Sequence, residues 1–274
     1  MLACNAPVYT ARTLAEALQL RADHPEAVLL AGGTDVMVFL EADRLDAPAF
    51  LNLWGCDGLQ GISEDGRKIG ALCTWAQVRE HHALPTALRA CARTVGAAQI
   101  QARGTVGGNI ANASPAGDSL PLWLALDARF TLQSLRGRRE VAAADFFLGY
   151  RKTAMAPDEL LVDIQLPAPN GELYYKKVGT RLAQAISKVV LGASIQVEGG
   201  VVRGLRVALG AVAPVPLRCR ALEEAMVGGP VRPELASLVQ QDIRPIDDVR
   251  SSAHYRARVA ENIVRSWLNS VQSG

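Results

Sequence analysis

Cysteine is sparse in this chain of 274 residues, and its placement excludes several kinds of site. The five cysteines are scattered, are odd in number and form no CxxC pair; they are Cys4, Cys56, Cys73, Cys91 and Cys219. Neither a disulfide framework nor a zinc or iron–sulfur site built by this chain alone is therefore expected. We expect free thiols in a reducing cytoplasm and no metal ligands.

The chain also lacks an excess of charge of one sign and any long apolar run. Its net charge is +2 without a basic block, so binding to nucleic acid or to acidic membranes is not predicted. No uninterrupted apolar run approaches the ~18 residues of a membrane span, and residues 1–18 do not resemble a secretory signal. Apolar residues make up 49% of the chain and charged residues 20%. This composition predicts a sizeable core in one large domain or two smaller ones, without membrane insertion.

The fingerprints of two common phosphate sites are absent as well. There is no GxxxxGK[ST], and GTVGGN does not match GxGxxG. Two runs of small residues stand in their place: residues 29–35 (LLAGGTD) and residues 101–118 (QARGTVGGNIANASPAGD). Glycine lets backbone amides approach a ligand closely, and amides alone can hold a phosphate. The two runs therefore predict loops that hold one phosphorylated ligand between them, with Gly32, Gly33, Gly107 and Gly108 as donors.

Three charged side chains in these runs each have two interpretations. Asp35 repels a phosphate, so we expect it to cap the following helix or to accept from hydroxyls. Asp118 fits hydroxyls of a ribose or ribityl chain, or a cap for the helix that follows it. Arg103 fits either a phosphate contact or a surface ion pair.

Local patterns before residue 167 predict alternating helices and strands. The capping box formed by Thr13 and Glu16 begins a helix that runs to residue 23. A strand at 27–31, a turn at Gly32 and Gly33, and a helix at 35–41 capped by Thr34 or Asp35 follow. The remaining predicted elements are strands at 49–53, 59–62, 68–72, 128–135, 140–142 and 159–166, and helices at 74–82, 85–98 and 119–126, with residues 101–118 left as a loop.

Residues 167–171 (PAPNG) are the best candidate for a domain boundary. Beyond them we expect strands at 173–178, 188–197 and 201–212, the last two joined by a tight turn at Gly199 and Gly200. Helices are expected at 217–227 and at 232–239. A last helix, capped by Ser251 or Ser252, has an apolar stripe that should face the core: Val259, Ile263, Trp267, Leu268 and Val271.

Four motifs, in this order and spacing, resemble one known family. They are LLAGGTDVMV, TVGGNIANASPAGDSLP, FFLGYRKTAMAPDELLVDIQLP and KKVGTRLAQAISKV. Together they are similar to the flavin-binding medium subunit of molybdenum hydroxylases, the xanthine dehydrogenase and carbon monoxide dehydrogenase family. The resemblance covers essentially the whole chain.

The resemblance implies an α+β fold in two domains. Residues 1–168 would form a two-subdomain FAD-binding fold of the vanillyl-alcohol-oxidase (PCMH) type, with subdomains at about 1–54 and 55–168. Residues 172–274 would form a small α/β C-terminal domain of the CO-dehydrogenase flavoprotein type, with a three-stranded antiparallel sheet.

The resemblance also implies which residues bind FAD. The pyrophosphate loop would be Leu29, Leu30, Ala31, Gly32, Gly33, Thr34, Asp35 and Val36. The second FAD loop would be Thr105, Val106, Gly107, Gly108 and Asn109, with Asn112 and Ser114 close by. Asp118 would hold FAD hydroxyls, Leu161 would pack on the isoalloxazine, and Lys177 would approach the flavin from the C-terminal domain. Lys188 and Arg181 also match the family pattern. Neither loop contains a histidine, so we expect non-covalent FAD.

By the same resemblance the chain is an electron-transfer subunit with no catalytic side chains of its own. It would accept electrons from [2Fe–2S] clusters of a small partner subunit and pass them from reduced FAD to NAD⁺ or another acceptor. A large partner subunit would hold molybdopterin, in a heterotrimer or its dimer. Two alternatives remain open: a self-sufficient flavin oxidoreductase, with His254 or Tyr255 as candidate bases, and a flavin-free scaffold subunit.

Overall fold

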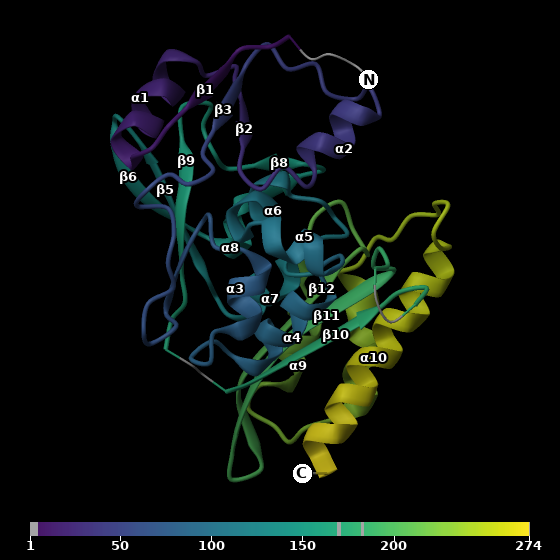
Figure 1. Cartoon of the computed structure of the whole chain (residues 1–274). Coiled ribbons are helices and arrows are strands. Elements are labelled where there is room, and N and C mark those ends of the chain that lie inside the picture. The colour runs from purple at the N-terminus through teal and green to yellow at the C-terminus, as the bar shows by residue number, and fades with distance from the viewer. Residues whose placement is uncertain (1–4, 169–170, 182–183, 274) are drawn as a thin grey trace.

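A parallel sheet opens the chain (Figure 1). The structure is a computed structural model and describes residues 5–168, 171–181 and 184–273. In this sheet β3 (Phe50–Asn52) lies between β1 (Val8–Thr10) and β2 (Val28–Leu30). Helix α1 (Leu14–Asp23) joins β1 to β2, and α2 (Val36–Glu41) follows β2. The predicted capping box at the start of α1 is confirmed, because the Glu16 amide donates to Thr13 Oγ1 and the Thr13 amide to Glu16 Oε2.

The second sheet is antiparallel, and one of its strands serves two cores. Its order is β4 (Lys68–Gly70), β9 (Leu160–Gln165), β5 (Arg129–Ser134) and β6 (Gly137–Ala142). On β9, Leu160 and Val162 join the core beneath the parallel sheet, whereas Leu161 and Ile164 join the central core. Side chains alternate between the two faces of a strand from Leu160 to Val162, and a register shift in the pairing with β5, between Thr131 and Leu132, accompanies the return of Ile164 to the core of Leu161. The LLVDI run thus buries both faces of β9.

Six helices and a two-stranded ribbon complete this part of the chain. They are α3 (Trp75–Glu80), α4 (Thr86–Thr94), α5 (Ala98–Arg103), α6 (Val106–Asn112), α7 (Leu120–Ala125), α8 (Ala143–Phe146), β7 (Phe147–Gly149) and β8 (Lys152–Thr153). Two of the helices, α6 and α8, pack on the sheet. The glycine-rich run 101–118 was expected to be a loop, and that prediction is wrong for much of it: α5 ends within it and α6 follows. The Thr105 hydroxyl caps α6 by accepting from the Gly108 amide, and Gly107 packs against Ala71, so tertiary contacts outweigh the poor helix propensity of glycine.

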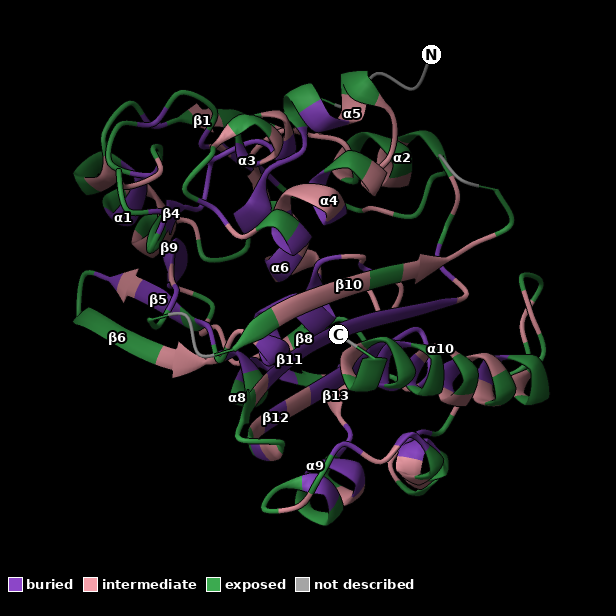
Figure 2. Ribbon diagram, turned by 90° about the horizontal axis from the view of Figure 1, so that it is seen from below, coloured by how far each residue is buried: buried purple, intermediate pink, exposed green. Residues whose placement is uncertain are grey.

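The C-terminal sheet is antiparallel, with the order β10 (Glu172–Val178), β11 (Val189–Glu198), β12 (Val201–Gly210) and β13 (Leu217–Arg218). The three predicted strands and the Gly199-Gly200 turn are confirmed, and the short β13 adds a fourth strand where a helix was expected to begin. Helix α9 (Arg220–Met226) starts later, and a 3₁₀ helix (Pro233–Gln241) replaces the expected α-helix. The middle strand β11 is largely buried in Figure 2, and α10 (Ala253–Ser273) packs its predicted apolar stripe into the adjoining core.

Helix α7 joins the central core to the C-terminal sheet. All six of its residues are buried. It lies against β11 and β12 at positions that hold glycine: a Cβ on Gly192 would stand 2.8 Å from the Leu122 amide nitrogen, and one on Gly210 would stand 2.9 Å from Pro121 Cγ. The two strand glycines therefore let the helix approach the sheet more closely than any side chain would permit.

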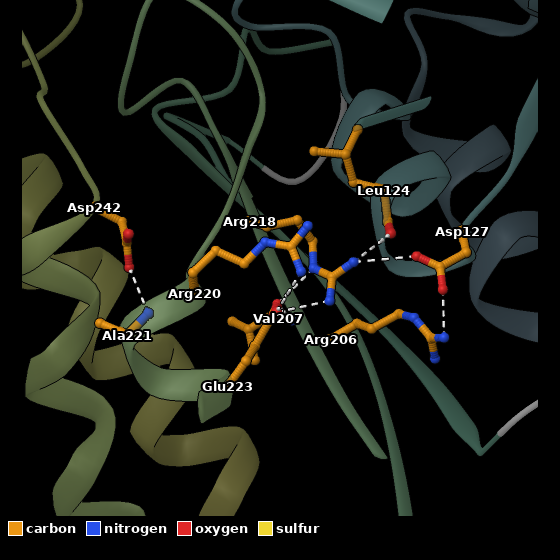
Figure 3. Close-up of polar contacts among 9 residues, drawn as sticks. All are labelled: Leu124, Asp127, Arg206, Val207, Arg218, Arg220, Ala221, Glu223 and Asp242. Atoms are coloured by element: carbon orange, nitrogen blue, oxygen red, sulfur yellow. Dashed lines mark hydrogen bonds and ion pairs between the residues drawn. The ribbon is translucent and has the colours of Figure 1, made fainter. Parts of the chain in front are cut away.

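Charged side chains continue this contact at the end of α7 (Figure 3). Arg218 donates to both oxygens of the buried Glu223, at 2.5 and 2.7 Å, and its Nη1 lies 3.1 Å from Asp127 Oδ1. Glu223 also accepts from the Val207 amide, and Arg206 pairs with Asp127. One arginine thus ties the segment after α7 to β13 and α9.

The four described cysteines, Cys56, Cys73, Cys91 and Cys219, are free, as predicted, and all four are buried. Cys4 lies outside the described residues. Burial raises the pKa of the Cys56 thiol to about 11. Among the described helices, none combines the length and the apolar character needed to cross a bilayer.

Candidate functional site

A cavity of about 540 Å³ lies where both predicted loops meet strand β9. Its walls come from β2, α2 and α6, and from the segment that runs from β8 into β9. Leu53, Leu59 and Leu72 make part of it apolar, while Gly32 to Asp35 bring backbone to its surface. The volume falls within the range of about 300–1,000 Å³ that is usual for small-molecule and cofactor sites.

The two loops touch each other beside this cavity. A Cβ on Gly32 would stand 1.8 Å from the Arg103 carbonyl oxygen, which leaves no room for any other residue. Gly33 has φ +78°, a left-handed conformation that favours glycine. The predicted proximity of the two glycine runs is thus a feature of the fold, and each glycine of LLAGGTD has its own steric reason.

The two runs differ in the hydrogen bonding of their amides. Within the described part of the chain, the amides of Gly32, Gly33, Thr34 and Asp35 donate to no protein acceptor. Unpaired amides at a cavity surface can bind an anion. The Asp35 side chain does not cap α2, so the predicted cap is wrong and these amides stay uncovered by their own side chains.

The amides of the second run are already engaged. Gly107 donates to the Ala71 carbonyl at 2.8 Å, and Gly108 donates to Thr105 Oγ1 at 3.1 Å. The prediction that these two glycines supply free amides to a phosphate is therefore wrong. Their role is steric: a Cβ on Gly107 would stand 2.6 Å from Ala71 Cβ, so glycine lets α6 lie close to the strand end beside the cavity.

Asn109 presents an oriented amide to the cavity. Its Oδ1 accepts from Ser119 Oγ at 2.7 Å, and that hydroxyl accepts in turn from Trp123 Nε1 at 3.0 Å. Because Oδ1 is occupied, the Nδ2 donor is the group left for a ligand. Ser119 and Trp123 are fully buried, so the orientation is set from inside the core.

A charged cluster lies at the cavity beside α2. Arg151 Nη1 donates to Asn112 Oδ1, and its guanidinium lies 4.9 Å from the centre of the Phe39 ring. Burial among these neighbours raises the pKa of Asp35, and the positive charge of Arg151 acts against that rise. Arg151 thus places a positive charge near the carboxylate of Asp35, the last residue of LLAGGTD.

Thirteen of the eighteen predicted FAD-binding residues line this one cavity. They are Leu29, Ala31, Gly32, Gly33, Thr34, Asp35, Val36, Thr105, Gly107, Gly108, Asn109, Asn112 and Leu161. The other five, all described by the structure, lie outside its lining: Leu30, Val106, Ser114, Asp118 and Lys177. Val106 is wholly buried and donates its amide to the Cys73 carbonyl, and the Ser114 carbonyl accepts from the Gly117 amide.

Asp118 and Lys177 pair with each other. Lys177 Nζ lies 2.6 Å from Asp118 Oδ2 and 3.0 Å from the Thr94 carbonyl oxygen, and Ser187 Oγ donates to Asp118 Oδ1. Both side chains are about nine-tenths buried. Burial raises the pKa of Asp118, and Lys177 opposes this effect. Neither side chain lines the cavity, but Val95, the residue after Thr94, does.

The two remaining residues of the family pattern lie further out. Lys188 Nζ is 5.0 Å from the centre of the Tyr255 ring on α10, and Arg181 donates to the Gln184 carbonyl. Arg103, predicted to face a phosphate or form an ion pair, instead lies over the Trp54 ring at 3.7 Å.

Sequence reasoning missed several residues at or beside the cavity. Arg21, Phe39, Met155 and Pro157 line it, while Ser119 and Arg151 orient residues that do. Arg151, Met155 and Pro157 all lie in the FFLGYRKTAMAPDELLVDIQLP motif, from which only Leu161 was singled out. The motif thus pointed to these residues, but no spacing rule distinguished those that line the cavity from Arg151, which contacts a lining residue.

Comparison with known proteins bears on what this cavity holds. A family model described as the FAD binding domain in molybdopterin dehydrogenase matches residues 3–169, and the CO dehydrogenase flavoprotein C-terminal domain matches residues 174–271. The chain belongs to the FAD-binding medium subunits of the xanthine dehydrogenase and carbon monoxide dehydrogenase family. The predicted family and fold class are thereby confirmed.

Similarity to individual members of this family extends over the whole chain. The xanthine dehydrogenase FAD-binding subunit of Escherichia coli O157:H7 is 32% identical over 96% of this chain and 95% of its own length. The glyceraldehyde dehydrogenase medium chain of Sulfolobus acidocaldarius is 31% identical over 95% and 96%. A solved structure of carbon monoxide dehydrogenase from Hydrogenophaga pseudoflava superposes with a TM-score of 0.91 at 28% identity, covering 98% of both chains.

The residues present fit the FAD that this family binds. Free amides at Gly32 to Asp35 suit a pyrophosphate, the apolar walls suit ring systems, and Gly32 lets the two loops meet beside the cavity. The protein is therefore an FAD-binding subunit of a dehydrogenase of the molybdenum hydroxylase type, which makes it part of an oxidoreductase. The individual FAD contacts listed from the sequence stay predictions.

Proposed function

We propose that this chain binds FAD non-covalently in the 540 Å³ cavity and relays electrons within a molybdenum hydroxylase complex. The observation that carries the proposal is the row of uncommitted amides at Gly32 to Asp35, at the surface of a largely apolar cavity. FAD would supply the redox chemistry, as flavins do in other enzymes, and the protein would bind and orient it.

Each group of cavity residues has a task in this proposal. The amides of Gly32 to Asp35 hold the pyrophosphate, and Arg151 balances the charge that Asp35 adds beside it. Asn109, oriented by Ser119, donates its Nδ2 hydrogen to a polar atom of the cofactor. Leu161 provides an apolar wall for the isoalloxazine. Asp118 and Lys177, which pair with each other and do not line the cavity, would have to separate before either could contact the cofactor.

The electron route and the partners belong to the same proposal. Electrons enter from [2Fe–2S] clusters of a small subunit and leave to NAD⁺ or another acceptor, while a large subunit carries molybdopterin. The three chains form a heterotrimer or its dimer in the cytoplasm, and residues 1–168 and 172–274 act as the FAD-binding and C-terminal domains. What supports this route is the family membership, together with relatives named as FAD-binding subunits and medium chains of dehydrogenases.

A self-sufficient flavin oxidoreductase is the alternative enzyme. Such an enzyme needs a general base next to its substrate. His254 and Tyr255, the bases considered from the sequence, are exposed on α10 and belong to no part of the cavity lining. The geometry therefore favours the relay.

The test uses the chain purified alone and then with its partner subunits. We expect the lone chain to bind FAD and show the two visible bands of oxidised flavin, and acid precipitation to release all of the flavin into solution. We expect FAD reduction by substrate only when the partners are present. A lone chain that takes up no FAD on reconstitution would refute the flavin site, and a lone flavoprotein that oxidises an organic substrate at the full rate of the complex would refute the relay.

A further inference from the structure

The wall of the cavity that carries Leu161 is built on a segment with little regular structure. Residues 154–159 connect β8, a two-residue strand, to the start of β9. Met155, Ala156 and Pro157 from this segment line the cavity, as do Leu160 and Leu161 directly after it. A cavity wall made of loop needs fixing from elsewhere if it is to keep its shape.

A buried carboxylate fixes this segment from within. Glu159 Oε2 accepts from the Ala156 amide at 2.7 Å, and the Glu159 amide donates to the Ala156 carbonyl at 3.0 Å. The side chain of Glu159 is only 6% exposed. The loop is thus closed twice at the same pair of residues, once by backbone and once by the carboxylate.

An arginine from the β5–β6 hairpin holds that carboxylate. Arg139 Nε lies 2.6 Å from Glu159 Oε1, and Arg139 Nη2 lies 2.8 Å from Oε2 and 2.7 Å from the Ala154 carbonyl oxygen. The guanidinium therefore makes a bidentate pair with Glu159 and also binds the start of the same loop. Bidentate arginine–carboxylate pairs add geometric precision as well as energy.

The adjacent residues form a similar pair in a different setting. Arg136 from the same hairpin binds Asp158 through Nε at 2.8 Å and Nη2 at 2.7 Å. Its side chain is 69% exposed, and that of Asp158 is 30% exposed. Among the described residues, no amide from another position of the segment donates to the Asp158 carboxylate, so this pair does not close the loop. The chain thus offers two neighbouring bidentate pairs to the same segment, of which only the buried one also accepts from the Ala156 amide.

We propose that Arg139 and Glu159 are positioning residues for the cofactor site: they clamp residues 154–159 so that Leu160 and Leu161 form a preorganised wall for the flavin. The inference rests on the proposed FAD-binding function. It extends that proposal to two residues, Arg139 and Glu159, that do not line the cavity. Loosening the clamp lets the wall move, and the site must then pay the ordering entropy when the cofactor binds.

The experiment compares Glu159→Gln and Arg139→Lys with the matched controls Asp158→Asn and Arg136→Lys, all in the full chain. Lysine keeps the charge of Arg139 but cannot form the bidentate pair. We expect the dissociation constant for FAD to rise tenfold or more in both clamp variants, at a temperature where circular dichroism shows them folded. In the two controls it should stay within about twofold of wild type.

Hydrogen exchange provides a readout that does not depend on FAD. In the apoprotein the Ala156 amide should exchange faster than in wild type in both clamp variants. In both controls its exchange rate should equal that of wild type. Clamp variants with wild-type FAD affinity and wild-type Ala156 exchange overturn the proposal, and so do controls that weaken FAD binding equally. If Glu159→Gln fails to fold, Arg139→Lys alone tests the proposal. We expect that variant to fold, because the Arg139 side chain is 48% exposed. A wild-type chain that binds no FAD refutes the flavin site instead, and the exchange of Ala156 still tests the clamp.

Discussion

Replacing Gly32 by alanine tests the contact on which the cavity depends. The added Cβ would lie 1.8 Å from the Arg103 carbonyl oxygen, whereas ordinary contact begins at 3.4 Å. The two loops must therefore separate by about 1.6 Å, because neither the carbonyl nor the Gly32 backbone has a flexible side chain that could move aside. The amides of Gly32 to Asp35 move with the loop, so the anion site should lose its geometry.

The size of the effect follows from the cost of overpacking. Forcing one extra methyl-sized group into a close-packed contact costs about 1–3 kcal/mol. If that cost falls on the FAD-bound state, it corresponds to about a 5- to 150-fold rise in the dissociation constant, at 1.4 kcal/mol per tenfold. Gly204→Ala is the control, because a Cβ there meets nothing closer than 3.7 Å and lies on β12, in the C-terminal sheet.

The measurement is a fluorescence titration of the apoproteins with FAD, together with thermal unfolding of each variant. We expect weaker binding in Gly32→Ala and unchanged binding in Gly204→Ala. A Gly32→Ala protein that binds FAD with wild-type affinity would show that the loop contact does not shape the anion site, and the reasoning from this glycine would fail.

Two further predictions concern charged side chains. Arg218→Met should destabilise the chain by about 3–5 kcal/mol, because it removes the buried bidentate partner of Glu223 and leaves this carboxylate only the 3.5 Å ion pair with Arg220. Arg220→Met, at a side chain that is 57% exposed, should change the denaturant midpoint little. For pH, the hydrogen bonds from Arg139 lower the pKa of Glu159 below its usual 4.5. The ionised carboxylate then stabilises the folded state above pH 4.5, and this stabilisation is lost as the pH falls through the folded pKa. The difference in free energy of unfolding between wild type and Glu159→Gln should therefore be largest at neutral pH and should vanish in acid. A gap that widens in acid would contradict this sign.

Local chemistry made much of the fold predictable. The capping box at Thr13 needs only its own neighbours, and the Gly199-Gly200 turn is set by two residues that tolerate a left-handed backbone. Strand β9 was predicted from an alternating pattern that ends at Pro167, although the sequence did not show that its two faces belong to different cores. The structure of such elements is determined by a few residues that are adjacent in the sequence.

The site was predictable in composition and less so in detail. Residues predicted in LLAGGTD line the cavity, but Gly107 and Gly108 have a steric role where an amide role was expected. The Gly108 amide is engaged by the nearby Thr105, whereas for Gly107 that difference depends on Ala71, which is more than thirty positions away in the chain. The same holds for Asp118 and Lys177, whose mutual contact spans two domains of the sequence. Residues distant in the sequence often determine whether a polar group has a hydrogen-bond partner, and a single sequence does not show which distant residues come into contact.

The buried helix α7 has a consequence for how the chain unfolds. Residues 167–171 mark a boundary in sequence, yet the helix before that boundary is covered on one side by the central core and on the other by the C-terminal sheet. Neither half can lose its structure without uncovering Leu122 and Trp123, both of which are fully buried. The segments that the two family models match therefore share one buried helix, and we expect them to unfold in a single cooperative transition.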